Sequence, residues 1–549
     1  MAFAQILFIW SLYAFVVVIL LAVASVFVHI YQTPPDRYPS VTFTCVIAIT
    51  SLLGTVLLLP VDVALVSSTT SPNLGRRKDW ATQDEIDKIT YSLTVVYYLL
   101  FSLDALLCLL GIPFAYFWCE EYDECATETS QQMVGWRLWG ALKYTMSFVA
   151  ILTILFLAGL FVPVSRNKEG TDPDYFKKLL AANRGERALT FAIAVLMAIG
   201  ICLYALYTSS GLALFPISLI KAAPSISNTR LQASAAVQLE RNRERQRQLE
   251  GRCEGNCDLL SSKDRRELDT LAREERTLLQ RQRLGDDAQG EGWNWLTKAW
   301  FNIEAVFRPF KFPGGILLLL VTFIAWVSML LTAIDKAKNS ICKNLCGYIL
   351  GRVNIFNPVN WALVQCANVF PVDYALFTLI VLLFFCSSVV GIAAVGIRFV
   401  RVRVFQIRQW HTPPQALLLA TEMLMLTILA LSYSISMLLA PQYATFGLQT
   451  FCDRAPEPPL DQPDCSNNKN SIKPCSGPTD NPAAQQVCTP SIASTFLNRI
   501  THNYPFLGAV FFWAQFLFLG ERQLDEDDEE AEEEGLLPRN GRRFYSTWQ

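Results

Sequence analysis

The 549-residue chain has little charge and almost no histidine. Asp, Glu, Lys and Arg make up 17% of it, whereas a soluble protein is about a quarter charged. It contains three histidines, and it has no glycine-rich phosphate loop, no zinc-protease histidine pair and no serine–histidine pattern. We therefore expect neither an enzyme nor an ATP-driven pump, with no metal site and no covalently bound cofactor. A net charge of −2 gives no support to nucleic-acid binding.

Long apolar runs take the place of the missing charge, and 52% of the residues are hydrophobic. A helix needs about 20 mostly apolar residues to cross the hydrocarbon of a bilayer. Nine runs qualify, at residues 6–28, 41–67, 93–118, 140–164, 188–215, 314–334, 374–397, 415–439 and 504–520. The sequence thus predicts an all-α polytopic membrane protein with about nine transmembrane helices, split five plus four.

A hydrophilic block at residues 216–313 separates the two groups of spans. It holds seventeen Lys and Arg against fourteen Asp and Glu, so it must lie outside the hydrocarbon, on one side of the membrane. Its basic excess favours the cytosolic side, which places the N-terminus in the lumen and the C-terminus in the cytosol. We predict membrane halves at 1–215 and 314–520, joined by this cytosolic block and followed by a cytosolic tail at 521–549.

Two stretches of this block, 229–250 and 261–284, are rich in Leu, Glu, Arg and Gln, which are good helix formers. We expect an antiparallel helical hairpin there, followed at 293–307 by an interfacial helix carrying three tryptophans. Two interpretations of the hairpin remain open. It is either a solvated spacer between the membrane halves or a docking surface for a cytosolic or membrane partner.

A Pro- and Asn-rich loop at 440–503 contains four cysteines, Cys452, Cys465, Cys475 and Cys488. The predicted topology places this loop in the lumen, where disulfides can form. Four cysteines allow three pairings. No Cys-x-x-Cys pair occurs in the predicted lumenal loops, so we expect disulfides that staple the loop rather than a metal site.

Three carboxylates fall inside predicted spans. Asp104 lies near the middle of the third, Asp62 toward one end of the second, and Glu422 about a third of the way into the eighth. A carboxylate at mid-depth costs on the order of 3 kcal/mol, so it usually faces a polar interior or is protonated. These residues are candidates for a polar pathway, with Asp104 first. The structural alternatives are a hydrogen bond from Asp104 to a neighbouring helix and an interfacial position for Asp62.

The tail is strongly acidic, and we expect the run that follows Gly520 to be disordered. Within it, Glu532 stands four residues before Leu536 and Leu537. An acidic residue at this distance from two leucines fits the dileucine signals that sorting adaptors read in cytosolic tails.

Several blocks of sequence together resemble one family. They are LLLPVDVALVSS in the second span, GALKYTMSFVAILTILFLAGLFVPV in the fourth, FPISLIKAAPS, RPFKFPGGILLLLVTFIAWVSMLLTAIDKAKNS, VFPVDYAL, and TPPQALLLATEMLMLTILALSYSISMLLAPQYATFGLQTF. These blocks are similar to the lysosomal cobalamin transport escort proteins of the limb-region membrane protein superfamily.

That resemblance implies a nine-span lysosomal or vacuolar membrane protein with a lumenal N-terminus and a cytosolic C-terminus. Members of the family are needed for cobalamin (vitamin B12) to leave the lysosome. They partner an ATP-binding-cassette half-transporter, which they help to deliver there. Cobalamin is then the expected transported ligand, with the chain acting as transporter or as escort. The alternative function is an endocytic receptor or adaptor at the plasma membrane, like the lipocalin-receptor relatives in the same superfamily.

Overall fold

The computed structural model describes residues 2–32, 38–120, 134–161, 184–221, 311–340, 348 and 354–535, the last range with short breaks within 368–370, 400–411 and 455–481. The chain divides into two compact units, one formed by Met1–Phe215 with Leu320–Gln549 and the other by Pro216–Leu319. Most of the predicted cytosolic block, including its helical hairpin, lies outside the described residues.

Within the described residues, seven helices are long and apolar enough to cross a membrane. They are α2 (Pro39–Ser67), α3 (Gln83–Leu106) continued by η1 (Leu107–Gly111) and α4 (Ile112–Glu120), α6 (Val134–Phe161), α8 (Arg184–Lys221), α12 (Lys311–Asn339), α14 (Val372–Val395), and α15 (Pro414–Ser434) continued by η5 (Ile435–Leu439). The predicted class, an all-α polytopic membrane protein, is confirmed.

The predicted count of nine spans is not confirmed over the described residues. α1 (Ala2–Tyr31) is helical throughout, but its apolar part with described side chains, Phe15–Tyr31, is short. The ninth run, expected as one straight span at 504–520, is instead part of a bent pair. α18 (Ile492–Asn503) and α19 (Pro505–Gly535) meet at 112°, and the pair counts as one further span at most. Pro505 explains the break, because a proline cannot continue the helix that precedes it.

The helix α19 also continues farther than the sequence suggested. Its backbone is helical to Gly535, although we expected disorder in the acidic run from residue 521. Glu, Leu, Gln and Arg are strong helix formers, and extending an existing helix avoids the cost of nucleating a new one. Residues 536–549 lie outside the described part of the chain.

Both π-helical segments precede a proline. Pro113 follows η1, and Pro441 follows η5. A proline ring in a helix clashes with the carbonyl of the residue four positions earlier, which here lies in the π segment in both cases. The wider π turn makes room for that carbonyl, so each bulge sits where the sequence requires it.

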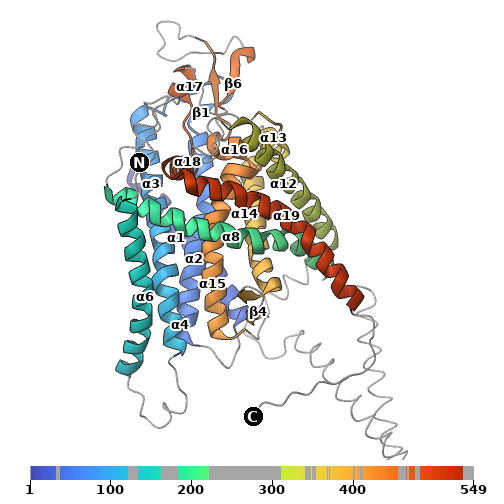
Figure 1. Cartoon of the computed structure of the whole chain (residues 1–549). Helices are drawn as coiled ribbons and strands as arrows, with labels where there is room; N and C mark the ends of the chain where they lie inside the picture. Colours follow the sequence, from blue (N-terminus) through green and yellow to red (C-terminus); the bar gives the residue numbers. More distant parts are fainter. Residues whose placement is uncertain are drawn as a thin grey trace, which may run out of the picture. The chain divides into compact units, whose positions relative to one another are not determined.

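The helix α2 lies at the centre of the larger unit. It contacts α1, α3, α14 and α15, and fifteen of its residues are buried. Figure 1 shows α2, α4, α6 and α15 running side by side, while α8 and α19 cross them. α8 packs very closely against α15 at Gly200 and against α14 at Gly211. A Cβ added at Gly200 would lie 2.1 Å from Leu426 O, and one added at Gly211 would lie 1.8 Å from Ser387 O.

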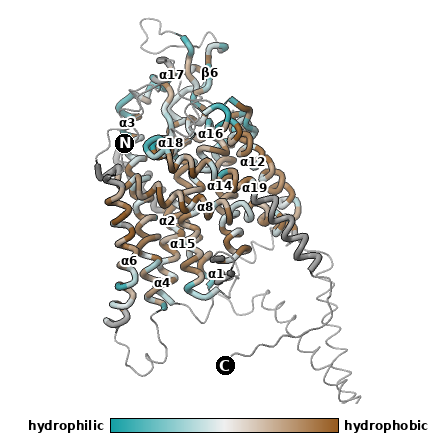
Figure 2. Tube along the Cα trace, in the orientation of Figure 1, coloured by the Kyte–Doolittle hydropathy of each residue, from teal (hydrophilic) through white to brown (hydrophobic). Residues whose placement is uncertain are grey.

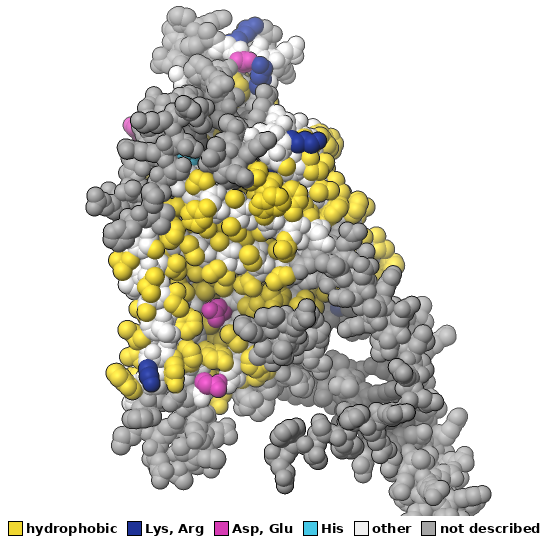
Figure 3. Space-filling view, in the orientation of Figure 1, with side chains coloured by type: hydrophobic (Ala, Val, Ile, Leu, Met, Phe, Trp, Pro, Cys, Tyr) yellow, Lys and Arg dark blue, Asp and Glu magenta, His cyan; other side chains and the backbone are white. Residues whose placement is uncertain are grey.

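Hydrophobic residues dominate the helices, and polar residues gather at their ends (Figure 2). Hydrophobic side chains cover most of the described part of the visible face, with basic side chains toward its two ends and acidic side chains among the hydrophobic ones in its lower half (Figure 3). This arrangement is what a bilayer requires of a surface that faces lipid.

Short strands lie at both ends of these helices. At one end the hairpin of β1 (Thr70–Ser71) and β2 (Arg76–Arg77) meets the hairpin of β5 (Thr450–Cys452) and β6 (Ile472–Pro474), with α13 (Pro358–Cys366), α16 (Pro441–Phe446) and α17 (Pro482–Val487) nearby (Figure 1). At the other end β3 (Ile397–Phe399) pairs antiparallel with β4 (Val402–Phe405), and Gln32 bridges Thr412. The start of α2 and the end of α14 therefore share one end, and the disulfide-bearing loop lies at the other.

Candidate functional site

Asp104 lies near the end of α3, just before η1, and is 5% exposed. Two hydroxyls of α2 donate to it. Ser51 Oγ lies 2.6 Å from Oδ1, and Thr55 Oγ1 lies 2.8 Å from Oδ2. Ser51 and Thr55 are four residues apart, so they lie on the same face of α2. Each oxygen of this carboxylate therefore has a donor, and the contact joins α3 to α2.

Asp62 is fully buried on α2, where it binds the start of α18. Ile492 N donates to Oδ1 at 3.2 Å, and Ala493 N donates to Oδ2 at 2.9 Å. The first N–H groups of a helix have no partner within it, and the helix dipole favours a negative charge there. Asp62 therefore holds the N-terminus of α18 against α2, across 431 residues of sequence.

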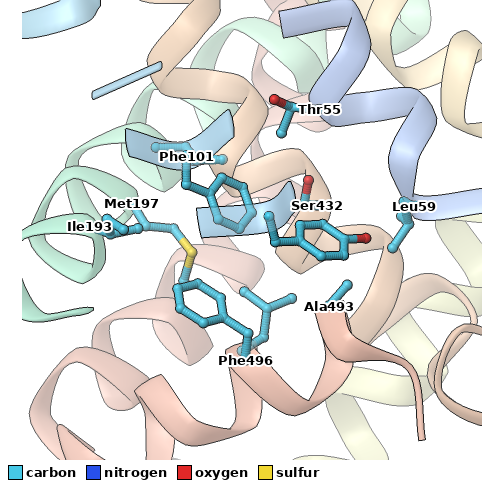
Figure 4. A pocket seen from close by; sticks show the side chains of 11 residues that line it. Thr55, Leu59, Phe101, Ile193, Met197, Ser432, Ala493 and Phe496 are labelled. Atoms are coloured by element: carbon cyan, nitrogen blue, oxygen red, sulfur yellow. The ribbon is translucent and has the colours of Figure 1, made fainter. Parts of the chain in front are cut away.

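A small cavity is lined by residues that include a hydrogen-bond partner of each carboxylate (Figure 4). Its walls come from α2, α3, α8, α15 and α18. Thr55, the donor to Asp104, lines it, and so does Ala493, whose N–H donates to Asp62. The free space is about 10 Å³, enough for about one water molecule. One enclosed space thus touches the hydrogen-bond partners of both aspartates.

Aromatic and thioether side chains keep this cavity small. Phe101 of α3 and Phe496 of α18 stack with ring centroids 5.4 Å apart, and Met197 of α8 lies beside them (Figure 4). These side chains reach the cavity from three different helices. Since α18 bears both Ala493 and Phe496, a displacement of α18 would enlarge the space.

Glu422 lies on α15 and is half-buried, and it does not line the cavity. Among the described residues, none forms a hydrogen bond or ion pair with its carboxylate. Cys108, one turn after Asp104, lies within electrostatic range of both Asp104 and Glu422. The cavity thus touches a hydrogen-bond partner of Asp62 and one of Asp104, while none of the three carboxylates, Glu422 included, lines it.

Comparison with known proteins gives the family. The model of the LMBR1-like membrane protein family matches residues 9–287. A protein of Aspergillus terreus named probable lysosomal cobalamin transporter is 66% identical, over 100% of this chain and 98% of its own length. The chain belongs to the LMBR1-like membrane protein family. Proteins of Aspergillus oryzae and Ajellomyces capsulatus with the same name are 62% and 59% identical, over 100% of this chain and 97% and 96% of theirs. No solved structure matches the chain.

In this LMBR1-like protein two disulfides hold the loop before α18. Cys452 is bonded to Cys465 and Cys475 to Cys488, with Cα–Cα distances of 5.7 and 5.9 Å. The structure therefore selects one of the three pairings that the sequence allowed. We call the described residues of 448–491 the disulfide cap.

The disulfide cap is hydrogen-bonded to the end of α2 and to the hairpin that follows it. Leu448 N donates to Ser67 Oγ at 3.1 Å, and Cys452 N donates to Gly75 O at 2.9 Å. Ser491, at the end of the cap, precedes α18, and its Oγ accepts from Ser494 N at 3.3 Å. The cap and Asp62 therefore fix the same helix end.

Several residues of this site in the LMBR1-like chain were not predicted from the sequence. Ser51 and Thr55 were not singled out, although two hydroxyls four residues apart in an apolar run are a detectable signal. The start of α18 was taken as loop, although Ser491 is a favourable N-cap residue. The sorting-signal residues Leu536 and Leu537 lie outside the described residues, and only the backbone at Glu532 is described.

Proposed function

We propose that this protein exports cobalamin from the lysosome or vacuole to the cytosol. The observation that carries the proposal is a small cavity among membrane-spanning helices, lined by hydrogen-bond partners of two buried carboxylates. The relatives named probable lysosomal cobalamin transporters support this ligand and this compartment. Their names do not favour the endocytic receptor that the superfamily also suggested.

The proposed orientation has the N-terminus in the lumen and the C-terminus in the cytosol. Disulfides need an oxidising compartment, so the end of the helix bundle that bears the disulfide cap is assigned to the lumen. The segment 398–414, RFVRVRVFQIRQWHTPP, follows α14 at the opposite end and has four Arg and no acidic residue. Such basic loops favour the cytosol.

The structure corresponds to a closed state of this transport path, because the cavity holds about one water. Cobalamin is far larger, so export requires helix movement. α18 is the element we expect to move. It lies on the lumenal side in the proposed orientation, it is bent from α19 by 112°, and it is attached to α2 through Asp62. The two aspartates then mark the lumenal and the central parts of the path.

Two partners complete the proposal. The family resemblance implies an ATP-binding-cassette half-transporter, and residues 216–313 would provide its docking surface. Sorting adaptors would read Glu532, Leu536 and Leu537 in the cytosolic tail. Replacing both leucines with alanine should redirect the protein to the plasma membrane, as seen by fluorescence microscopy of a tagged chain. Unchanged location would remove the adaptor role.

Labelled-cobalamin efflux from purified lysosomes or vacuoles tests the export function. Organelles lacking the chain should retain cobalamin, and the wild-type chain should restore efflux. D104N should restore it only in part, because it removes the charge between α2 and α3 while keeping a similar shape. D87N, at an exposed position on α3, is the matched control. Normal efflux without the chain would eliminate the export role.

Reconstitution separates carrier from escort. If the purified chain alone moves cobalamin across liposomes, it is a carrier. If flux appears only when an ATP-binding-cassette half-transporter is added with ATP, the chain acts as its escort.

A further inference from the structure

Lys336 is buried among membrane-spanning helices without an acceptor for its charge. It lies on α12 and is 5% exposed. In the described part of the chain its ammonium group makes no hydrogen bond or ion pair, and it faces the ring of Tyr433 on α15 with Nζ 5.5 Å from the centroid. Asp335, the adjacent acid, accepts instead from Asn339 Nδ2 at 2.6 Å and from Asn354 N at 2.9 Å.

The position of Lys336 is fixed by the packing of its helix. One and two turns earlier on α12, Thr332 Oγ1 accepts from Asn357 Nδ2 at 2.9 Å and Ser328 Oγ donates to Leu439 O of η5 at 3.1 Å. These bonds tie α12 to the N-cap of α13 and to η5, which continues α15. A buried ammonium lacking a partner is costly, and such groups commonly mark ligand or ion sites within membranes.

Gln515 of α19 is a second buried polar residue that has an atom without a hydrogen-bond partner. It is 3% exposed, its Nε2 donates to Tyr433 Oη at 3.4 Å, and its Oε1 has no partner. A half-turn of the amide moves no other side chain, since the two amide ends have nearly the same shape. Oε1 then accepts from the Tyr433 hydroxyl, and the NH₂ group becomes a free donor beside the ring that Lys336 faces.

A role for Lys336 at the end of α12 does not explain its burial. Cations do stabilise the C-terminal turn of a helix, but this effect is far weaker than the cost of burying an ammonium. Lys338 lies in the same turn and is exposed, so it already provides that favourable charge. Lys336 therefore needs a negative group that the described residues do not provide.

We propose that Lys336, Tyr433 and Gln515 form a binding site for a phosphodiester monoanion. The Lys336 ammonium and the Gln515 amide NH₂ donate to its two free oxygens, while Tyr433 orients both groups. A single negative charge matches a single buried lysine, and charge-assisted hydrogen bonds of this kind are the strong ones. Cobalamin carries one phosphodiester in its nucleotide loop, so this source of the anion rests on the proposed function. A phospholipid headgroup offers the same chemistry.

Ligand binding to the purified full-length chain in phosphate-free maltoside detergent tests the site. Cobalamin is compared with cobinamide, which keeps the corrin ring but lacks the phosphodiester, by isothermal titration calorimetry. We expect the wild type to bind cobalamin at least about tenfold more tightly than cobinamide. K336M should remove this preference, K336R should keep most of it, and K338M is the matched control that should behave as the wild type.

Equal affinity of the wild type for both corrinoids, or full preference in K336M, would overturn the cobalamin assignment. If the wild type binds neither corrinoid, the carrier form of the proposed function fails, but the anion site is still tested by dimethyl phosphate and by phosphatidylglycerol. Each should raise the thermal unfolding midpoint of the wild type and not of K336M. A rise with phosphatidylglycerol alone identifies a lipid headgroup as the source. No rise with either anion, together with no corrinoid preference, refutes the site.

Discussion

Around the cavity, α2, α3 and α18 bury Asp62 and Asp104 with a hydrogen-bond donor on every carboxylate oxygen. Against α15, α12 buries Lys336 with no acceptor in the described part of the chain. Buried charges that are fully hydrogen-bonded hold helices in place, whereas an unpartnered one destabilises the empty protein until a ligand arrives. The carboxylates thus join α2 to α3 and to α18, and the amine is the group that we propose binds a ligand. Substitutions in the two regions should therefore have opposite effects on stability.

The largest effect is expected when Asp104 loses both donors. S51A combined with T55V leaves a buried carboxylate unpaired, which should lower stability by about 3–5 kcal/mol. The thermal unfolding midpoint of the purified protein in detergent measures this. T50V is the control, because Thr50 is half-buried and its hydroxyl bonds only to Val46 O within α2. A midpoint equal to that of T50V would mean that these hydroxyls do not hold the helices together.

Opening a disulfide of the disulfide cap should give the next largest loss of stability, and this loss should be confined to the cap. Opening Cys475–Cys488 with serine at both positions releases a loop whose ends are 13 residues apart, and closing a loop of that size is worth roughly 3 kcal/mol. Limited proteolysis should cut the cap faster. C202S removes an exposed free cysteine and should leave the cleavage rate unchanged. Equal rates in the two variants would contradict a stapling role.

Replacing Asp62 should lower stability by less, because asparagine keeps one of the two acceptor oxygens of the carboxylate. D62N removes the charge at the start of α18 and leaves one N–H without its acceptor, which we expect to cost about 2 kcal/mol. Hydrogen exchange measured by mass spectrometry should rise at the first turn of α18 and not at α6. D87N again serves as the exposed control. Unchanged exchange in α18 would show that the helix is fixed by the disulfide cap alone.

Replacing Lys336 should change stability the least, and in the opposite direction to the substitutions around the carboxylates. K336M should leave the ligand-free protein as stable as the wild type, or more stable by about 1 kcal/mol, because it removes an unpartnered buried charge while filling a similar volume. The unfolding midpoint without added anion tests this against K338M. A large fall in the midpoint would show that Lys336 is paired in the empty protein, and the contrast with the carboxylates would fail.

Much of the fold was predictable because membrane helices are encoded locally. Runs such as 41–67 and 374–397 fall within α2 and α14 almost residue for residue. The prediction was wrong for the last run, since a hydropathy window reports apolar content and does not detect the bend between Asn503 and Pro505. It also gave a loop where β3 and β4 pair, because a hairpin this short leaves little periodicity to detect.

The candidate site was predictable only as a set of residue types. Sequence pointed to Asp104 and Asp62 because charge is rare in apolar runs, but it could not say that their hydrogen-bond partners Thr55 and Ala493 line one cavity. Lys336 escaped attention because it stands near the end of an apolar run, where lysines usually reach the interface. Only the neighbouring Tyr433 and the packing of α12 show that it does not.

The sequence by itself determined which segments are membrane helices and which residues carry charge into them, since both follow from the composition of short stretches. The tertiary structure alone decided which of these charges are paired. The donors for Asp62 lie 430 and 431 residues away and those for Asp104 lie 49 and 53 residues away. Hydrogen bonds depend on distances of a few ångströms between helices, and no local pattern sets those distances.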